Sequence, residues 1–324
     1  MSTRRTVPAL SALALIGATV LAACGGGGGA DANAGGLAWG NSETVAGGRA
    51  GAPKHGDAPA AVTSACKSSA SPKIAAIKKN GTLNWGIGIS PPFGFTGPSS
   101  KWQGVEAENA VELADILGVK PNIVAFDYSV MTTALQSKKA DIVGAQLFDT
   151  PERRQAIDFS KPYYKSGQVY YVLESSSYKT IADLNAPSIK FVYGTGGAQG
   201  GLAKKFTPQA QSNEVGLQGQ LIPYQFLATK RADATMGEAA AYPVLKKKFT
   251  NPPVVAIGKN GRISADLPAV AETLDPFDVA FGLPKGDAGW KKCVNAWVAW
   301  GSSSSGPISQ RVTYWLKNQD KVNG

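Results

Sequence analysis

Hydrophobic positions after about residue 65 follow two alternating spacings, one typical of strands and one typical of helices. Residues 106–117 place their apolar side chains along one broad helical stripe, and Gly118 follows as the expected C-cap. Alternation of strands with helices favours an α/β fold with mixed sheets. The expected strands are residues 82–89, 122–126, 141–145, 168–174, 189–193, 254–257 and 279–283, and the expected helices are residues 106–117, 130–138, 178–184, 202–206, 288–300 and 308–316.

One expected helix breaks a local rule. Thr150 and Pro151 are typical of a helix start, which puts Arg153 and Arg154 in its first turn. The backbone dipole disfavours a cation there by about 0.3–1 kcal/mol. Local rules are typically broken at functional sites, so this stretch is a candidate site.

The N-terminus has the three parts of a secretory signal. Arg4 and Arg5 precede an apolar run over residues 7–20, and small residues follow up to Cys24. The run is too short for a stable membrane span. Leu-Ala-Ala-Cys resembles the lipobox of bacterial lipoproteins, which implies cleavage after residue 23 and lipidation of Cys24. A plain signal peptide that ends near a cysteine is the alternative.

Residues 24–65 are rich in Gly and Ala, with few large apolar side chains, and we expect a flexible tether there. The lone histidine, His55, lies within it, so the chain offers no Ser-His or His-metal chemistry. The net charge is +10. Nucleic acid is not expected as a partner of the protein. The N-terminal signal predicts export, and the lysines of the chain are scattered without interleaved aromatic residues.

Two cysteines remain after Cys24. Cys66 and Cys293 are most economically a disulfide in an exported protein, and free thiols are the alternative.

Between an expected strand and an expected helix, residues 194–201 form a glycine-rich loop. Its backbone N–H groups are suited to a carboxylate, whereas it lacks the lysine and the spacing of a nucleotide-binding loop.

Several motifs occur in the order and spacing of the family 3 extracellular solute-binding proteins, the polar amino-acid receptors of ABC importers. The resemblance covers about residues 74–316, and it rests on Pro91-Pro92-Phe93-Gly94-Phe95, Gly104-Val105-Glu106-Ala107-Glu108, Ala134-Leu135-Gln136, Lys139-Ala140-Asp141, Thr150-Pro151-Glu152-Arg153, Asp158-Phe159-Ser160 and Pro162-Tyr163-Tyr164.

That resemblance implies the type II periplasmic-binding-protein fold, in which two α/β lobes joined by two hinge strands close on one ligand. Lobe one is expected over residues 66–171 and 280–324, and lobe two over residues 172–279. Both cysteines then lie in lobe one, which makes the disulfide geometrically reasonable.

The resemblance also implies site residues. Arg153 matches the carboxylate-binding arginine, and Arg154 is interpreted as a solvated charge. Glu238 stands where an aspartate usually accepts the ligand ammonium, with a surface glutamate as the alternative. Tyr128 stands where an aromatic residue often stacks on the ligand. We also expect ligand contacts from Phe93 and from the loop residues Thr195, Gly196 and Gly197.

Four positions depart from the family pattern. Ser90 replaces a common aromatic residue, Gln146 a common glycine, and Phe148 a common threonine or serine, while Ile87 stands where some cation-binding members have an aspartate. A pocket of this kind is poorly equipped for lysine or arginine. It favours a less polar amino acid or an organic anion.

The expected function is a lipid-anchored, monomeric receptor outside the cytoplasm that binds an amino acid or small carboxylate and delivers it to an ABC permease. No cofactor and no metal are expected. One alternative is an enzyme on the same scaffold, similar to cyclohexadienyl dehydratases, with Glu238 as the acid-base group and with Glu106 and Glu108 as helix-start residues. The other is a sensor without transport.

Overall fold

The computed structural model describes residues 58–97, 100–216 and 221–318 of the chain. The expected signal peptide (residues 1–23), the lipidation site Cys24 and the tether up to residue 57 lie outside the described residues, so they stay predictions. In the part that the structure describes, every helix is too short or too polar to serve as a membrane span.

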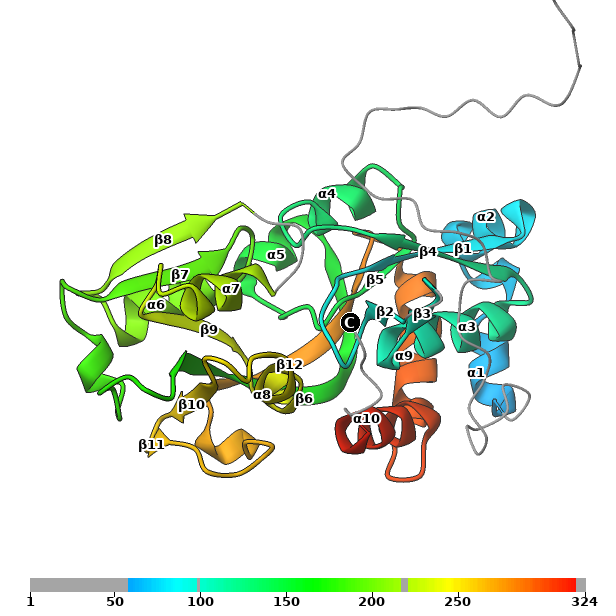
Figure 1. Ribbon diagram of the computed structural model, residues 1–324. Coiled ribbons are helices and arrows are strands. Elements are labelled where there is room, and N and C mark those ends of the chain that lie inside the picture. Colours follow the sequence, from blue (N-terminus) through cyan, green and yellow to red (C-terminus); the bar gives the residue numbers. More distant parts are fainter. Residues whose placement is uncertain (1–57, 98–99, 217–220, 319–324) are drawn as a thin grey trace, which may run out of the picture. The chain divides into compact units, whose positions relative to one another are not determined.

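A mixed β-sheet is the central element of the fold (Figure 1). Its strands lie in the order β4 (Lys120–Ala125), β1 (Thr82–Ile87), β5 (Ile142–Gly144), β12 (Leu274–Leu283), β6 (Asp158–Leu173), β9 (Ala234–Glu238), β7 (Lys190–Gly194) and β8 (Gln211–Val215). Strand β10 (Val254–Gly258) pairs with β6, and β11 (Gly261–Arg262) pairs with β10. A separate small pair joins β2 (Phe95–Thr96) to β3 (Trp102–Gln103).

Each end of this sheet carries its own helices. Lobe one comprises β1 to β5 with the helices α1 (Ala60–Ala65), α2 (Pro72–Asn80), α3 (Val105–Leu117), α4 (Met131–Gln136), α5 (Pro151–Ala156), α9 (Ala288–Gly301) and α10 (Pro307–Lys317). Lobe two comprises β7 to β11 with the helices α6 (Gln199–Phe206), α7 (Ile222–Ala228) and α8 (Tyr242–Lys248). The C-cap of α3 is Gly118 in the left-handed conformation, as its sequence predicts.

Two long strands link the lobes. Strands β6 and β12 pair antiparallel with each other; β12 also pairs with β5 of lobe one, and β6 with β9 and β10 of lobe two. Figure 1 shows both strands running from one lobe into the other. The expected lobe boundaries, 171/172 and 279/280, fall inside these strands, which belong to both lobes.

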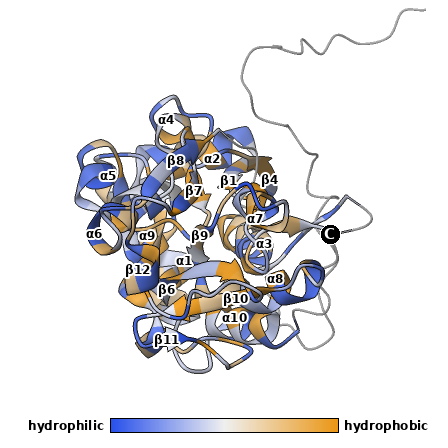
Figure 2. Cartoon of the chain, turned by 60° about the vertical axis from the view of Figure 1, so that its left-hand side comes forward, coloured by the Kyte–Doolittle hydropathy of each residue, from blue (hydrophilic) through white to orange (hydrophobic). Residues whose placement is uncertain are grey.

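Each lobe has apolar clusters of its own, although the main lobe-one cluster also includes Val244 of α8 in lobe two. In lobe one, the Phe281 ring stacks on Trp297 with centroids 5.1 Å apart and meets the edge of Trp85 at 5.4 Å. Lobe two packs its own aromatic residues, such as Tyr171 against Tyr224 at 5.2 Å. Figure 2 shows the contrast in hydropathy between the outer helix α5 and the core strand β10. Most of the apolar burial that stabilises each lobe therefore lies within that lobe.

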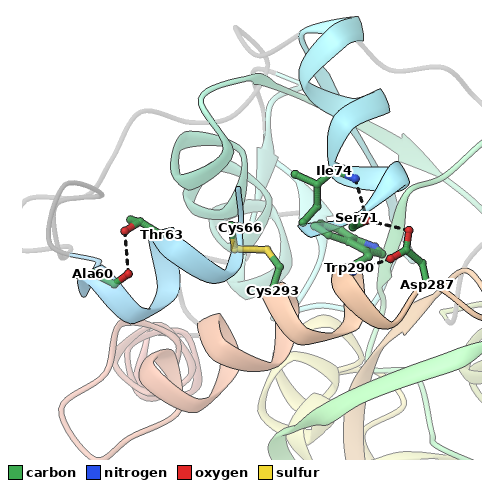
Figure 3. Close-up of a disulfide and its surroundings, with 8 residues drawn as sticks. All are labelled: Ala60, Thr63, Cys66, Ser71, Ile74, Asp287, Trp290 and Cys293. Atoms are coloured by element: carbon green, nitrogen blue, oxygen red, sulfur yellow. Dashed lines mark hydrogen bonds between the residues drawn. A yellow bond between two sulfur atoms is a disulfide. The ribbon is translucent and has the colours of Figure 1, made fainter. Parts of the chain in front are cut away.

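A disulfide joins the start of the described chain to its end. The Sγ atoms of Cys66 and Cys293 are 2.06 Å apart, so the expected bridge is present within lobe one (Figure 3). Cys66 follows α1, which packs against α9, and Val62 of α1 is buried. The tether predicted up to residue 65 is thus wrong at its end, because residues 60–65 form a helix with a buried side.

Two further expectations about local structure were wrong. Residues 178–184 form no α-helix but end in a short 3₁₀ turn, Ala182–Leu184. The Asp183 carboxylate accepts hydrogen bonds from the backbone of Lys179 and Thr180, each 2.8 Å long, and this local bonding competes with a helix. Helix α5 is only six residues long, so Arg153 and Arg154 also lie in its last turn and the dipole argument fails.

Candidate ligand cleft

A small cavity of about 20 Å³ lies between the lobes. A single water needs roughly 10–15 Å³ by this kind of measure, so the space holds about one water. Six of the ten predicted ligand-binding residues line it. The cavity is bordered by Tyr128, Gln146, Phe148 and Arg153 of lobe one and by Gly197, Ala198, Gln199 and Glu238 of lobe two.

Arg153 reaches the cavity from α5. Thr150 caps the helix by accepting a hydrogen bond from the Arg153 backbone N–H at 3.3 Å. Among the described residues, the guanidinium donates only to neutral carbonyls, to Phe148 O at 3.0 Å and to Gly196 O of lobe two at 3.2 Å. Burial lowers the pKa of this guanidinium. Among the described residues Arg153 forms no ion pair, so its charge is open to an anion.

Arg154 behaves differently although it is the next residue. Its guanidinium donates two hydrogen bonds to Asp149 and its side chain is 65% exposed. The pair with Asp149 raises the pKa of Arg154. Arg154 does not line the cavity, as expected for a solvated charge.

Glu238 faces Arg153 from the far wall. It ends β9 and is 3% exposed, so it is not the surface glutamate of the alternative interpretation. Its Oε2 accepts from Gln146 Nε2 at 2.6 Å and from Ser166 Oγ at 3.0 Å. Burial, with a smaller contribution from the charge of Glu106, raises the pKa of Glu238 to about 8, against the Ser166 hydrogen bond. Within the described part of the chain, no cation lies in ion-pair range of this carboxyl.

Gln146 joins the two lobes beneath the cavity. Its Nε2 donates to Glu238, and its Oε1 accepts from Ser90 Oγ at 2.5 Å. Gln146 and Ser90 are 2% and 3% exposed. Ser90 therefore reaches the site through Gln146 and does not itself line this cavity.

Two aromatic side chains form the remaining lobe-one wall. The Tyr128 hydroxyl donates to Ala145 O at 2.8 Å, which fixes the ring, and burial raises its pKa. The Phe148 ring packs on Phe277 of β12 with centroids 3.4 Å apart. Phe148 supplies an apolar face where the family pattern has a hydroxyl.

A larger groove adjoins the cavity. It has a volume of about 650 Å³ and shares Phe148, Arg153, Gly197 and Ala198 with the cavity. Volumes of roughly 300–1,000 Å³ are usual for small-molecule pockets. Arg153 thus stands at the border between a nearly filled polar cavity and an open groove.

Phe93 was a wrong prediction for the ligand site. Its side chain is fully buried in the lobe-one core, where it packs on Tyr164 at 5.2 Å. Position 93 belongs to a family motif, but the ring serves packing rather than the cavity.

The glycine-rich loop also behaves differently from the prediction. Thr195 is exposed and donates to Val215 O at 3.3 Å. The N–H groups of Gly196 and Gly197 point to Glu214 and to Gly194 O, so they are not free for a carboxylate. What Gly196 offers is its carbonyl, which accepts from Arg153. At φ +76° a side chain on Gly196 would meet the Ser129 backbone at 2.4 Å, so the close approach of the lobes requires glycine.

Glu106 is a buried acid that the sequence interpretation underrated. It lies in the first turn of α3, as expected, but it is fully buried. Its Oε1 accepts from the Tyr163 hydroxyl, its Oε2 has no partner in the described residues, and burial raises its pKa to about 7. Its helical spacing to Ala110 and Leu113 places it on the apolar face of the helix, and this spacing could have indicated that Glu106 is buried. Glu106 lies close enough to influence the pKa of Glu238.

Metal binding finds no support in the described residues, where no group of three acidic, His or Cys side chains is placed around a common point.

The family model of the bacterial extracellular solute-binding proteins, family 3, matches residues 73–318. The chain belongs to this family.

Curated relatives of this solute-binding protein match it in part. The L-cystine-binding protein TcyJ of Escherichia coli (strain K12) is 36% identical over 122 residues, which cover 37% of this chain and 46% of that protein. The octopine-binding periplasmic protein of Rhizobium meliloti is 32% identical over 144 residues, 43% of this chain and 47% of that protein. The chain spans about half the length of these curated relatives.

Solved structures match over more of the fold. The ancestral amino acid-binding protein AncCDT-1, a precursor of cyclohexadienyl dehydratase, is 27% identical with a TM-score of 0.65, and the match covers 75% of this chain and 99% of that one. The predicted type II periplasmic-binding-protein fold, with two α/β lobes around a cleft, is thereby confirmed.

Proposed function

We propose that this solute-binding protein is an extracytoplasmic receptor that binds an amino acid or a related small carboxylate and delivers it to an ABC importer. One observation carries the proposal: Arg153 and Glu238, neither of which forms an ion pair with another described residue, face the same cavity from opposite lobes. A zwitterion complements both, because its carboxylate and its ammonium each need a partner once water is excluded.

Binding involves movement of the cleft. The present cavity holds about one water, so a ligand enters only when the lobes separate or the side chains between them move. Since the two charges lie on different lobes, a ligand that contacts both favours the closed form. The permease then recognises the closed receptor, which acts as a monomer held at the membrane by a lipid on Cys24.

The test is a ligand screen with a matched pair of variants. Thermal-shift measurements against the standard L-amino acids, L-cystine and small carboxylates should reveal a ligand, since a ligand at 100 times its Kd stabilises a protein by about 2.7 kcal/mol. Arg153→Ala should abolish that shift, whereas Arg154→Ala should leave it intact. A ligand that binds equally well to Arg153→Ala contradicts the assignment.

A role without catalysis is part of the proposal. Glu238, with its raised pKa, is the one group in the cavity suited to proton transfer, and it is already bonded to Gln146 and Ser166. Purified protein incubated with cyclohexadienyl acids should show no turnover above the uncatalysed rate. Turnover that Glu238→Gln removes would establish the enzymatic alternative instead.

A further inference from the structure

Gln146 occupies the space beside Glu238 that the proposed function assigns to a ligand ammonium. Its amide Nε2 lies 2.6 Å from Glu238 Oε2, a short contact for an N–H donor. Ser90 holds the other end of the amide at 2.5 Å. This arrangement fills most of the space beside Glu238, since the cavity left there measures about 20 Å³.

The backbone at Gln146 is unusual for a glutamine. Its φ is +49°, in the left-handed region, where a residue with a Cβ is strained and glycine is not. Such strain persists only where the surroundings hold the residue in place. Here the two side-chain hydrogen bonds, to Ser90 and to Glu238, hold it.

An amide N–H and an ammonium N–H are the same kind of donor to a carboxyl group. The ammonium bond is the stronger, because hydrogen bonds with an ionised partner are roughly twice as strong as neutral ones. We propose that Gln146 is a specificity-determining residue: its amide stands in for a ligand ammonium at Glu238, and an amino acid must displace it in order to bind. This inference rests on the proposed function.

Displacement lowers affinity for one class of ligand only. A compound with an ammonium group must break the bonds of Gln146 to Glu238 and Ser90 before it can use Glu238. A carboxylate without an amino group can bind Arg153 and leave Gln146 where it is. Gln146 therefore weakens amino acids relative to the corresponding simple carboxylic acids.

The experiment is calorimetric titration of the natural protein and of Gln146→Gly with the standard L-amino acids. The tightest binder is paired with the carboxylic acid that lacks its amino group. Glycine suits the left-handed backbone and removes the amide. Gln146→Gly should lower the Kd of the amino acid by about tenfold or more and leave that of the deaminated acid within about twofold.

Matched variants separate this effect from others. Lys138 is exposed and has a φ of +62°, so Lys138→Gly relieves the same backbone strain away from the cavity and should not change binding. Ser90→Ala frees the amide of Gln146 without touching its backbone and should tighten amino-acid binding in the same direction, by less. It also keeps the test valid if Gln146→Gly fails to fold.

Each outcome bears on the inference. The inference is supported if Gln146→Gly binds amino acids and the natural protein does not. It is also supported if Gln146→Gly binds the amino acid more tightly than the natural protein does while its affinity for the deaminated acid is unchanged. Unchanged or weaker amino-acid binding in Gln146→Gly and Ser90→Ala overturns it while leaving the receptor function intact, and so does an equal gain for the deaminated acid. Failure of every protein to bind any compound overturns the proposed function, and this inference with it.

Discussion

Glu112 and Glu238 are two acids that the fold buries in different ways. Glu112 lies in lobe one with its carboxylate fully buried. It accepts from Arg311 at 2.7 and 2.9 Å and from Trp297 Nε1 at 2.8 Å. Glu238 is almost as buried, yet among the described residues its side chain accepts hydrogen bonds from the neutral groups of Gln146 and Ser166. Within the described residues, Glu112 has a cation as its partner and Glu238 does not.

This difference distinguishes an acid that stabilises the fold, Glu112, from an acid that is suited to a ligand, Glu238. A buried charge is costly unless it is paired, so a purely structural acid finds its cation within the chain, as Glu112 does in Arg311. In the described part of the chain Glu238 has no such cation, and it lies at the wall of a cavity whose opposite side holds Arg153, which forms no ion pair there either. A cationic group and an acid that face one space are what a zwitterionic ligand complements.

The largest expected effect comes from breaking the structural pair. Arg311→Met leaves Glu112 buried without its cation, which should lower the free energy of unfolding by about 3–5 kcal/mol. Arg153→Met serves as the control, because in the described residues that guanidinium donates hydrogen bonds to neutral carbonyls and forms no ion pair; it should cost less than about 1 kcal/mol. Chemical denaturation measures both. Equal losses in the two variants would mean that the pairing of Glu112 does not distinguish the two sites.

A smaller effect should appear in the pH dependence of stability. The pKa of Glu238 rises from 4.5 to about 8 on folding, so the folded state holds this proton more tightly than the unfolded state. The associated stability is present below pH 4.5 and is lost as pH rises to about 8. Glu238→Gln removes that loss and should stabilise the protein at pH 8 by on the order of a few kcal/mol, with little effect at pH 4.5.

Thermal unfolding across this pH range checks the second prediction. Glu112→Gln is the matched control: it should destabilise the protein at pH 8, because it removes the nearer of the two carboxylates that pair with the buried Arg311, at 2.7 Å against 3.6 Å for Glu108. Stabilisation by Glu238→Gln that does not change with pH would show that the carboxyl is not responsible.

The ligand-site half of this contrast could be predicted from sequence, whereas the pairing of Glu112 with Arg311 was not predicted. Family motifs around Thr150 pointed to Arg153, and the position five residues after Asp233 pointed to Glu238. The alternation of strands and helices indicated the α/β class, since periodicity reports directly on which faces are buried. Local signals suffice where a residue's role is fixed by its motif.

The remaining features depend on contacts between distant segments. Ser166 reaches Glu238 only because β6 and β9 pair antiparallel in a register that places Gln168 opposite Glu238. The loop from 194 to 201 turned its Gly196 carbonyl, not its N–H groups, toward Arg153. No spacing along the chain encodes either result, because both depend on how the two lobes meet.

The smallest expected effect comes from Ser166, whose hydrogen bond to Glu238 affects the ionisation of that carboxyl. An ammonium ligand needs an ionised Glu238, so its Kd should rise about tenfold for each pH unit below about 8. The Ser166 hydrogen bond lowers the pKa of Glu238, and Ser166→Ala should therefore shift the onset of this weakening upward by about one pH unit, worth about 1 kcal/mol. Titration between pH 6 and 9 measures the shift, with exposed Ser137→Ala as a control that should leave the profile unchanged. A profile that stays in place, or moves to lower pH, would show that Glu238 does not bind the ligand as an ionised acid.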